Sequence, residues 1–354
     1  MDPRIIEHAK ILVEWSTEVK KGDMVGILTS PEGYELAIAV TKLVAKAGGR
    51  PVSVLWTDEM ARAFFDGADN ETIQLFPKHL LAMIESVDVV IAMNAPYNTK
   101  TLAGVSPEKQ MLNAKTMEPI MGAYLSKRWV GTIHPCNSLA QQGSMSLEEY
   151  RDFVYDAVLI DWKEASKKVY MIKERLEKQS SVRFIGPETD LFASTEGRIW
   201  IAGDGKHNMP CGEIFTAPVE DTVEGKIYFD IPLLQYGKVL DGIRLTFEKG
   251  EVVDYSAEKE EATLKQVIET DEGSRRLGEM AIGTNRGIKK YTLNMLFDEK
   301  LGDTVHCALG RAYEDCNGTN QSAIHVDIIK SMKEGEILAD DDVIYSKGKF
   351  FFED

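Results

Sequence analysis

The sequence has little of several features that would assign a protein to a class. It has four cysteines in 354 residues, too few for a disulfide framework. Lysine and arginine number 41 against 57 acidic residues, and a net charge of −16 disfavours nucleic acids and anionic membranes as partners. Apolar runs such as Val87–Ala95 are too short to span a bilayer, and the first residues do not resemble a secretion signal. We therefore expect a cytoplasmic protein that binds neither nucleic acid nor membrane.

The first half lacks the glycine-rich loops that bind nucleotides. The turn after the apolar run Met24–Leu28 reads Thr-Ser-Pro-Glu-Gly, which contains neither Gly-x-Gly-x-x-Gly nor a phosphate-binding lysine. We therefore expect no nucleotide cofactor site. What this half does contain is an alternation of helical patterns with short apolar runs, among them Pro51–Leu55, Val87–Met93 and Arg128–Ile133. This order is typical of an α/β domain with a mainly parallel sheet.

The pattern changes near residue 180. A helical stretch rich in lysine, glutamate and alanine extends from about Ser146 to Gln179. Beyond it the segments are short, β-prone and interrupted by glycine, as in Gly225–Asp230. We predict two domains, an α/β domain over residues 1–180 and an α+β domain over residues 181–354 that carries the chemistry.

Two histidines in the second half have neighbours that point to metal binding. His325 and Asp327 are two apart in an apolar, β-prone run, so a strand would place them on one face. Burying such a pair is costly without a partner, and a divalent metal accepts imidazole and carboxylate together. A hydrogen-bonded pair at a surface edge is the simpler interpretation. His306 lies 19 residues upstream of His325 in a similar apolar context.

Two isolated glutamates strengthen the metal hypothesis. Glu213 and Glu279 each stand among glycine and apolar residues, where a carboxylate needs a charged partner. Three carboxylates and two imidazoles exceed what one ordinary zinc site needs. They suit two metals about 3.5–4 Å apart, bridged by a carboxylate. The residues are spread over more than a hundred positions, so their spacing alone is weak evidence.

Four ordered motifs resemble the thermophilic metalloaminopeptidase family, of which aminopeptidases T and S are named types. The motifs are Asn208-Met-Pro-Cys-Gly-Glu-Ile-Phe-Thr-Ala-Pro218, Leu277-Gly-Glu-Met-Ala-Ile-Gly-Thr-Asn285, His306-Cys-Ala-Leu-Gly-Arg-Ala-Tyr313 and Ser322-Ala-Ile-His-Val-Asp327. They cover essentially the whole second domain. One departure is Cys211, where members of the family often have threonine; we expect a packed, inert thiol there, although it could approach the metals.

The resemblance implies a hydrolase that removes N-terminal residues from peptides with a free N-terminus. It implies two divalent ions per chain, zinc or cobalt, with manganese or magnesium as further candidates, and a homodimer in which the first domain helps to enclose the active site. The residues it implies are the metal ligands Glu213, Glu279, His306, His325 and Asp327 and the catalytic residue Tyr313.

The expected chemistry is hydrolysis by a water that two cations have activated. Glu213 and Glu279 are both candidates to take the proton of that water, and the sequence does not decide between them. Tyr313, seven residues after His306, is expected to donate its hydroxyl to the developing oxyanion; its alternative role is ordinary core packing.

A second hypothesis uses part of the same set. His306, His325 and Asp327 have the composition of the triad that holds mononuclear non-haem iron(II), and some proteins similar to this family are ring-cleaving dioxygenases. Such a triad needs neither Glu213 nor Glu279, which favours the peptidase. A metal-free binding protein would leave all five residues unexplained.

Overall fold

The structure is a computed structural model that describes residues 2–353, and these form two compact units. Unit 1 comprises the chain up to Ile160 together with Gly205–Pro210, and unit 2 comprises Asp161–Asp204 and the chain from Cys211 onwards. The division therefore comes before the expected boundary at residue 180. The reason is the helix α9 (Trp162–Leu176), whose Val169, Ile172 and Leu176 belong to the hydrophobic core of unit 2.

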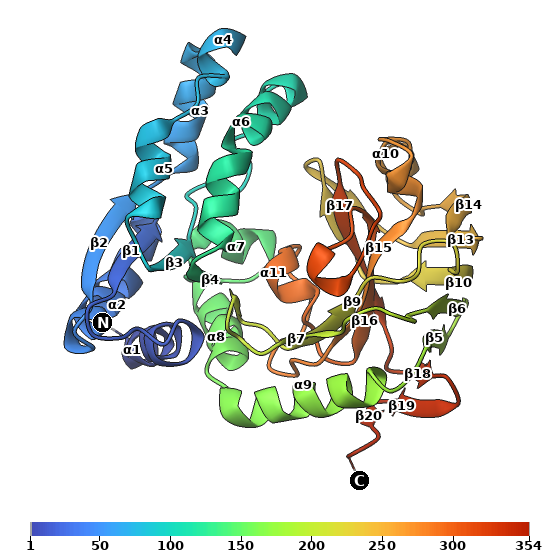
Figure 1. The fold of residues 1–354 in the computed structure, drawn as a ribbon. Coiled ribbons are helices and arrows are strands. Elements are labelled where there is room, and N and C mark those ends of the chain that lie inside the picture. The colour runs from blue at the N-terminus through green and yellow to red at the C-terminus, as the bar shows by residue number, and fades with distance from the viewer. Residues whose placement is uncertain (1, 354) are drawn as a thin grey trace. The chain divides into compact units, whose positions relative to one another are not determined.

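Unit 1 is built on a parallel sheet (Figure 1). Its five strands lie in the order β2 (Arg50–Leu55), β1 (Met24–Thr29), β3 (Val89–Asn94), β4 (Arg128–Ile133) and β8 (Asn208–Met209). β1 and β3 are largely buried and β4 is buried or half-buried, as their apolar sequences predict for a sheet covered on both faces. The alternation of strands and helices in the first half is confirmed.

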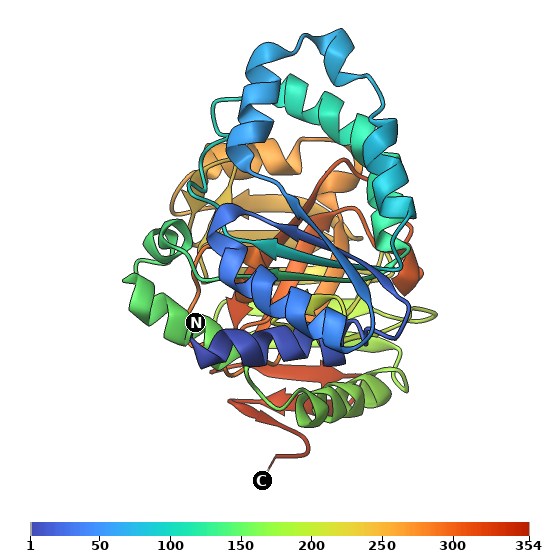
Figure 2. The same cartoon turned by 90° about the vertical axis from the view of Figure 1, so that its left-hand side faces the viewer.

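Helices connect these strands, and α1 and α2 pack side by side against the sheet (Figure 2). The helices of unit 1 are α1 (Pro3–Lys10), α2 (Tyr34–Lys46), α3 (Asp58–Gly67), α4 (Asn70–Ile73), α5 (Lys78–Glu85), α6 (Pro107–Leu125), α7 (Asn137–Gln142) and α8 (Leu147–Val158), with a π-helical continuation of α1 at Ile11–Ser16 and a short 3-10 turn at Pro31–Gly33. Asp2 caps α1 by accepting a hydrogen bond from the Arg4 backbone N–H.

The long helical stretch expected over 146–179 is two helices, α8 and α9. Ser146 and Glu149 form a capping box at the start of α8, and Leu159 leaves the helical conformation at its end. Asp161 then caps α9 by accepting hydrogen bonds from the backbone of Lys163 and Glu164. Asp161 therefore starts a new helix. The apolar periodicity of the sequence continues across the break between α8 and α9.

Unit 2 contains two antiparallel sheets and a small hairpin. The eight-stranded sheet has the order β14 (Glu251–Ser256), β13 (Ile243–Glu248), β10 (Glu224–Phe229), β6 (Thr189–Ser194), β5 (Ser181–Gly186), β18 (Glu336–Ala339), β19 (Asp342–Ser346) and β20 (Lys349–Phe350). The five-stranded sheet, which we call the site sheet, has the order β17 (His325–Ser331), β16 (Thr304–Gly310), β15 (Leu277–Gly283), β9 (Glu213–Thr216) and β7 (Ile201–Gly203). The hairpin pairs β11 (Leu233–Gln235) with β12 (Lys238–Leu240).

The helices of unit 2 and one continuous apolar core complete it. Besides α9 they are α10 (Glu261–Ile268), α11 (Met295–Asp298) and short 3-10 turns at Gly273–Arg275 and Glu314–Cys316. Met280, Ile282, Cys307 and Leu309 point from the site sheet into the core. The predicted combination of an α/β first part and an α+β second part is confirmed. Within residues 2–353, every helix is too short or too polar to cross a membrane.

Candidate metal centre

One face of the site sheet carries all five residues predicted as ligands. They are Glu213 on β9, Glu279 on β15, His306 on β16, and His325 and Asp327 on β17. Residues two apart on a strand face the same way, and the register pairs both Glu279 and Asp327 with Ala308 of the strand between them. Four sequence segments therefore contribute to one surface. The opposite face of β15 and β16 is occupied by the apolar core, so these polar residues alternate with core residues.

Small residues separate the candidate ligands on this face. Ala308 lies between Glu279 and Asp327, and Ala281 lies opposite His306. Gly283 is paired with Glu213, and a Cβ there would lie 2.2 Å from the backbone oxygen of Leu301. Few side-chain atoms therefore fill the space between the carboxylates and the imidazoles on this face.

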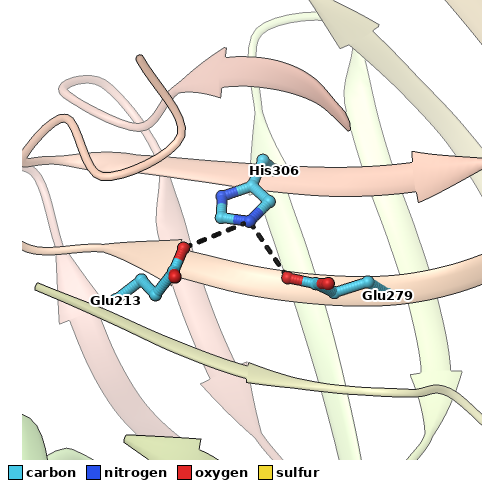
Figure 3. Close-up of side chains that lie close together, drawn as sticks. All are labelled: Glu213, Glu279 and His306. Atoms are coloured by element: carbon cyan, nitrogen blue, oxygen red, sulfur yellow. Dashed lines mark hydrogen bonds and ion pairs between the residues drawn. The ribbon is translucent and has the colours of Figure 1, made fainter. Parts of the chain in front are cut away.

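Glu279 is the centre of the arrangement. Its Oε1 lies 3.2 Å from His306 Nε2 and its Oε2 lies 3.3 Å from His325 Nε2. His306 Nε2 also lies 3.7 Å from Glu213 Oε2, and Figure 3 shows the histidine directed between the two glutamates. On the other side, His325 Nε2 lies 3.6 Å from Asp327 Oδ1. The Glu279 carboxylate thus contacts both histidines. His306 also faces Glu213, and His325 also faces Asp327.

These contacts define two overlapping groups of donor atoms. The potential ligand atoms of Glu213, Glu279 and His306 lie within 4.8 Å of one another, and so do those of Glu279, His325 and Asp327. Glu279 belongs to both groups. Mixed imidazole and carboxylate donors suit zinc and similar divalent ions.

The second nitrogen of His325 is arranged as it is in many metal-binding histidines. Nδ1 lies 2.7 Å from the backbone oxygen of Arg311. A carbonyl oxygen only accepts, so Nδ1 carries the proton and donates it, which leaves Nε2 for a cation when the ring is neutral. The residues present therefore fit a metal centre in donor type and in the orientation of this ring.

Electrostatics within the site favour the charged forms of His306, His325 and Glu279. Burial opposes the charge on His306, but the hydrogen bond to Glu279 and the neighbouring carboxylates outweigh it and raise its pKa to about 9. The same balance, with Asp327 and Glu279 as partners, raises the pKa of His325 to about 11. Burial raises the pKa of Glu279, but hydrogen bonds from both imidazoles lower it further, so the pKa falls below its ordinary value. Without a metal, protonated imidazoles neutralise these carboxylates.

Sequence reasoning missed two residues of this site, Glu299 and Lys300. Potential ligand atoms of Glu299, His306 and Asp327 also lie within 4.8 Å of one another. Lys300 is fully buried, and its Nζ lies 3.1 Å from Glu213 Oε1 and contacts Glu299 Oε1. In the sequence these two residues stand in the run Asp298-Glu-Lys300, which has the appearance of an ordinary solvated charge cluster.

Tyr313 lies beside the predicted ligands. Its ring centroid is 4.9 Å from that of His325 and 5.8 Å from that of Phe215, and the residue is 44% exposed. Burial and the carboxylates of Glu279 and Asp327 raise the pKa of its hydroxyl, which therefore stays protonated as a donor. Phe215 was not predicted, although its position two residues after Glu213 on one strand would have indicated the shared face.

The remaining predicted residue of interest, Cys211, is buried near Glu213. A Cβ on Gly203 would lie 2.7 Å from Cys211 Sγ and 3.0 Å from Glu213 Cγ, so both side chains border the same glycine. Cys211 belongs to none of the groups of potential ligands among the described residues. No such group contains only His306, His325 and Asp327 either, because a glutamate takes part in every one.

The family model of thermophilic metalloproteases (M29) matches residues 1–350. The chain belongs to this family. Among its relatives is aminopeptidase 2 of Geobacillus stearothermophilus, 27% identical over 376 residues that cover 91% of this chain and 90% of the relative. The predicted enzyme class, a metalloaminopeptidase among the hydrolases, is confirmed by the family and by its curated relatives.

Two solved structures share the fold. Wild-type AmpT from Thermus thermophilus is 24% identical, with 99% of each chain covered and a TM-score of 0.86. The 2,5-dihydroxypyridine dioxygenase of Pseudomonas putida KT2440 is 15% identical, with 100% of this chain and 99% of that chain covered and a TM-score of 0.66. A fold does not fix a reaction, and at these identities the likeness concerns the fold alone.

Proposed function

We propose that this metalloaminopeptidase removes N-terminal residues from peptides with two divalent ions. Glu213, Glu279 and His306 would hold one ion, and Glu279, His325 and Asp327 would hold the other. The observation that carries the proposal is the position of Glu279, which directs one carboxylate oxygen toward each histidine. A carboxylate shared in this way suits a pair of divalent ions about 3.5–4 Å apart.

Two divalent ions bound there would supply the charge that lowers the pKa of a water molecule from 15.7 toward about 7. The protein residues then have three tasks. Glu213, which is not shared between the two ions, accepts the proton of that water and returns it to the leaving amine. Tyr313 donates its hydroxyl to the carbonyl oxygen as negative charge develops on it. The apolar core behind β15 and β16 holds the site sheet rigid, so that these groups keep their positions.

The finer assignments rest on chemistry and on family resemblance. Zinc or cobalt suits the mixed imidazole and carboxylate donors best, with manganese or magnesium as further choices. The family resemblance supports a homodimer. Cytoplasmic location is supported by the four cysteines, none of which forms a disulfide.

Hydrolysis of an aminoacyl-p-nitroanilide tests the proposal. We expect the purified protein to hold close to two divalent ions per chain and to cleave this substrate. A chelator should abolish cleavage and cobalt or zinc should restore it. The N-acetylated substrate is the matched control and should remain intact, because it lacks the free amine.

The opposite result is equally definite. The proposal fails if metal-loaded protein ignores every substrate with a free amine. Bound iron in a ratio of one per chain, with oxygen consumption in the presence of a hydroxylated aromatic, would instead establish the dioxygenase.

A further inference from the structure

Lys300 is a cation buried inside a site that is expected to bind cations. It is fully buried, and its Nζ contacts two carboxylates, Glu213 Oε1 at 3.1 Å and Glu299 Oε1. Buried lysines are rare unless paired, so both partners are needed to keep the ammonium there.

The backbone holds Lys300 firmly in this place. Asn285 N–H donates to the Lys300 backbone oxygen at 3.0 Å, and Gly302 N–H donates to the Asn285 oxygen at 3.0 Å. The segment from Glu299 to Leu301 crosses directly over Gly283, where a Cβ would meet backbone oxygens of both residues. Lys300 therefore lies where the Glu299–Leu301 segment packs against and hydrogen-bonds to the segment Gly283–Asn285, and not on a surface loop.

The contacts of Lys300 divide the carboxylates of the site into two kinds. Glu279 and Asp327 face imidazoles. Glu299 is close enough to His306 and Asp327 to act as a ligand, yet its oxygen contacts the ammonium. Glu213 has one oxygen on the ammonium and the other toward His306. Lys300 thus holds one oxygen of Glu299 and one of Glu213, and leaves the second oxygen of Glu213 facing His306.

We propose that Lys300 is a positioning residue of the metal centre: its ammonium holds Glu299 outside the ligand set and fixes Glu213 so that Oε2 faces His306. This inference rests on the proposed two-ion function and adds to it the residue that limits which carboxylates bind the ions. Without the ammonium, nothing holds the Glu299 carboxyl group away from His306 and Asp327, and a cation there recruits it.

The test compares Lys300→Met with the double variant Glu299→Gln/Lys300→Met. The visible absorption of bound cobalt(II) reports the number and geometry of its ligands. We expect Lys300→Met to alter this spectrum and to lower kcat about 100-fold, the scale of a small misplacement in a site, with a much smaller change in KM. Replacing Glu299 in the double variant should reverse the part of the spectral change that Glu299 causes and recover part of kcat, while the part that comes from the lost Lys300–Glu213 contact remains.

A second readout needs no metal. In metal-free protein, Lys300→Met should lower the melting temperature because Glu213 and Glu299 lose their counter-charge, and Glu299→Gln should restore part of it. Lys330→Met is the matched control. Lys330 is also fully buried in unit 2, but it lies on the face of β17 opposite His325 and Asp327, and its acidic partner is Asp230 at 4.0 Å. Its replacement should leave the cobalt spectrum and kcat unchanged.

The outcomes separate this inference from the proposed function. Wild-type protein that takes up no cobalt refutes the two-ion centre itself. A wild-type protein that binds two cobalt ions, together with an unaltered spectrum in Lys300→Met or no rescue by Glu299→Gln, refutes only the role of Lys300. If Lys300→Met does not fold, Glu299→Gln alone decides, because a residue outside the ligand set leaves the cobalt spectrum unchanged and a ligand does not.

Discussion

Replacing Glu279 with glutamine should remove both ions at once. The substitution keeps the volume of the side chain and removes only its charge. Glu279 is 4% exposed, and its two oxygens lie 3.2 and 3.3 Å from the Nε2 atoms of His306 and His325. Because it is the one residue common to both proposed subsites, no other single carboxylate of the set has this effect.

The magnitude follows from its burial. Breaking a buried charge pair by removing one partner costs about 3–5 kcal/mol. At about 1.4 kcal/mol for each factor of ten, this corresponds to a loss of roughly 10²- to 10⁴-fold in metal affinity. Protein dialysed against metal-free buffer should therefore retain almost no ion, and turnover of a p-nitroanilide should fall by a comparable factor.

Metal analysis of a graded series is the assay. Glu213→Gln should keep one of two ions, since the subsite of Glu279, His325 and Asp327 remains intact. Glu220→Gln is the control, because Glu220 accepts hydrogen bonds from Thr319 and pairs with Arg198 outside the site. Two retained ions in Glu279→Gln, or equal losses in Glu213→Gln and Glu279→Gln, would refute the shared carboxylate.

The remaining predictions concern a catalytic donor and acid stability. Tyr313→Phe should lower kcat about 10²- to 10³-fold while metal content stays unchanged, because it removes one donor to the oxyanion; unchanged kcat would assign Tyr313 to packing. Burial lowers the pKa of His8 to about 3, so the unfolded chain binds the extra proton first and stability falls as the pH drops below about 6.5. At pH 5 the loss is about 2 kcal/mol, and His8→Gln, unlike the exposed His79→Gln, should abolish it in urea unfolding at pH 7 and 5.

The sequence predicts those parts of the molecule whose signal is local. Arg128–Ile133 is a strand in both the sequence pattern and the structure. His325 and Asp327 share a face because strand period two requires it, and both point toward the site. The helix expected over 146–179 is broken at Asp161, because a short connection that preserves the apolar periodicity cannot be distinguished from a continuous helix.

Glu299 and Lys300 could not be recognised because their importance is tertiary. Both are buried or nearly buried only because the segment that carries them crosses Gly283, more than fifteen positions upstream. Gly283 can be seen in the sequence, but the sequence does not show which segment packs against it. An ion pair of neighbouring residues is ordinarily exposed, and local sequence contains no sign of the exception.

The residues of the site favour the proposed two-ion hydrolysis over a mononuclear iron site. Burial raises the pKa of Glu299 to about 8, so this residue is mostly protonated at pH 7. The charged groups are then the carboxylates of Glu213, Glu279 and Asp327 and the ammonium of Lys300. With neutral imidazoles, two divalent ions would exceed the net negative charge of these groups. That surplus positive charge matches the negative charge that develops on a carbonyl oxygen during hydrolysis, whereas a mononuclear triad would leave Glu213 and Glu279 without a role.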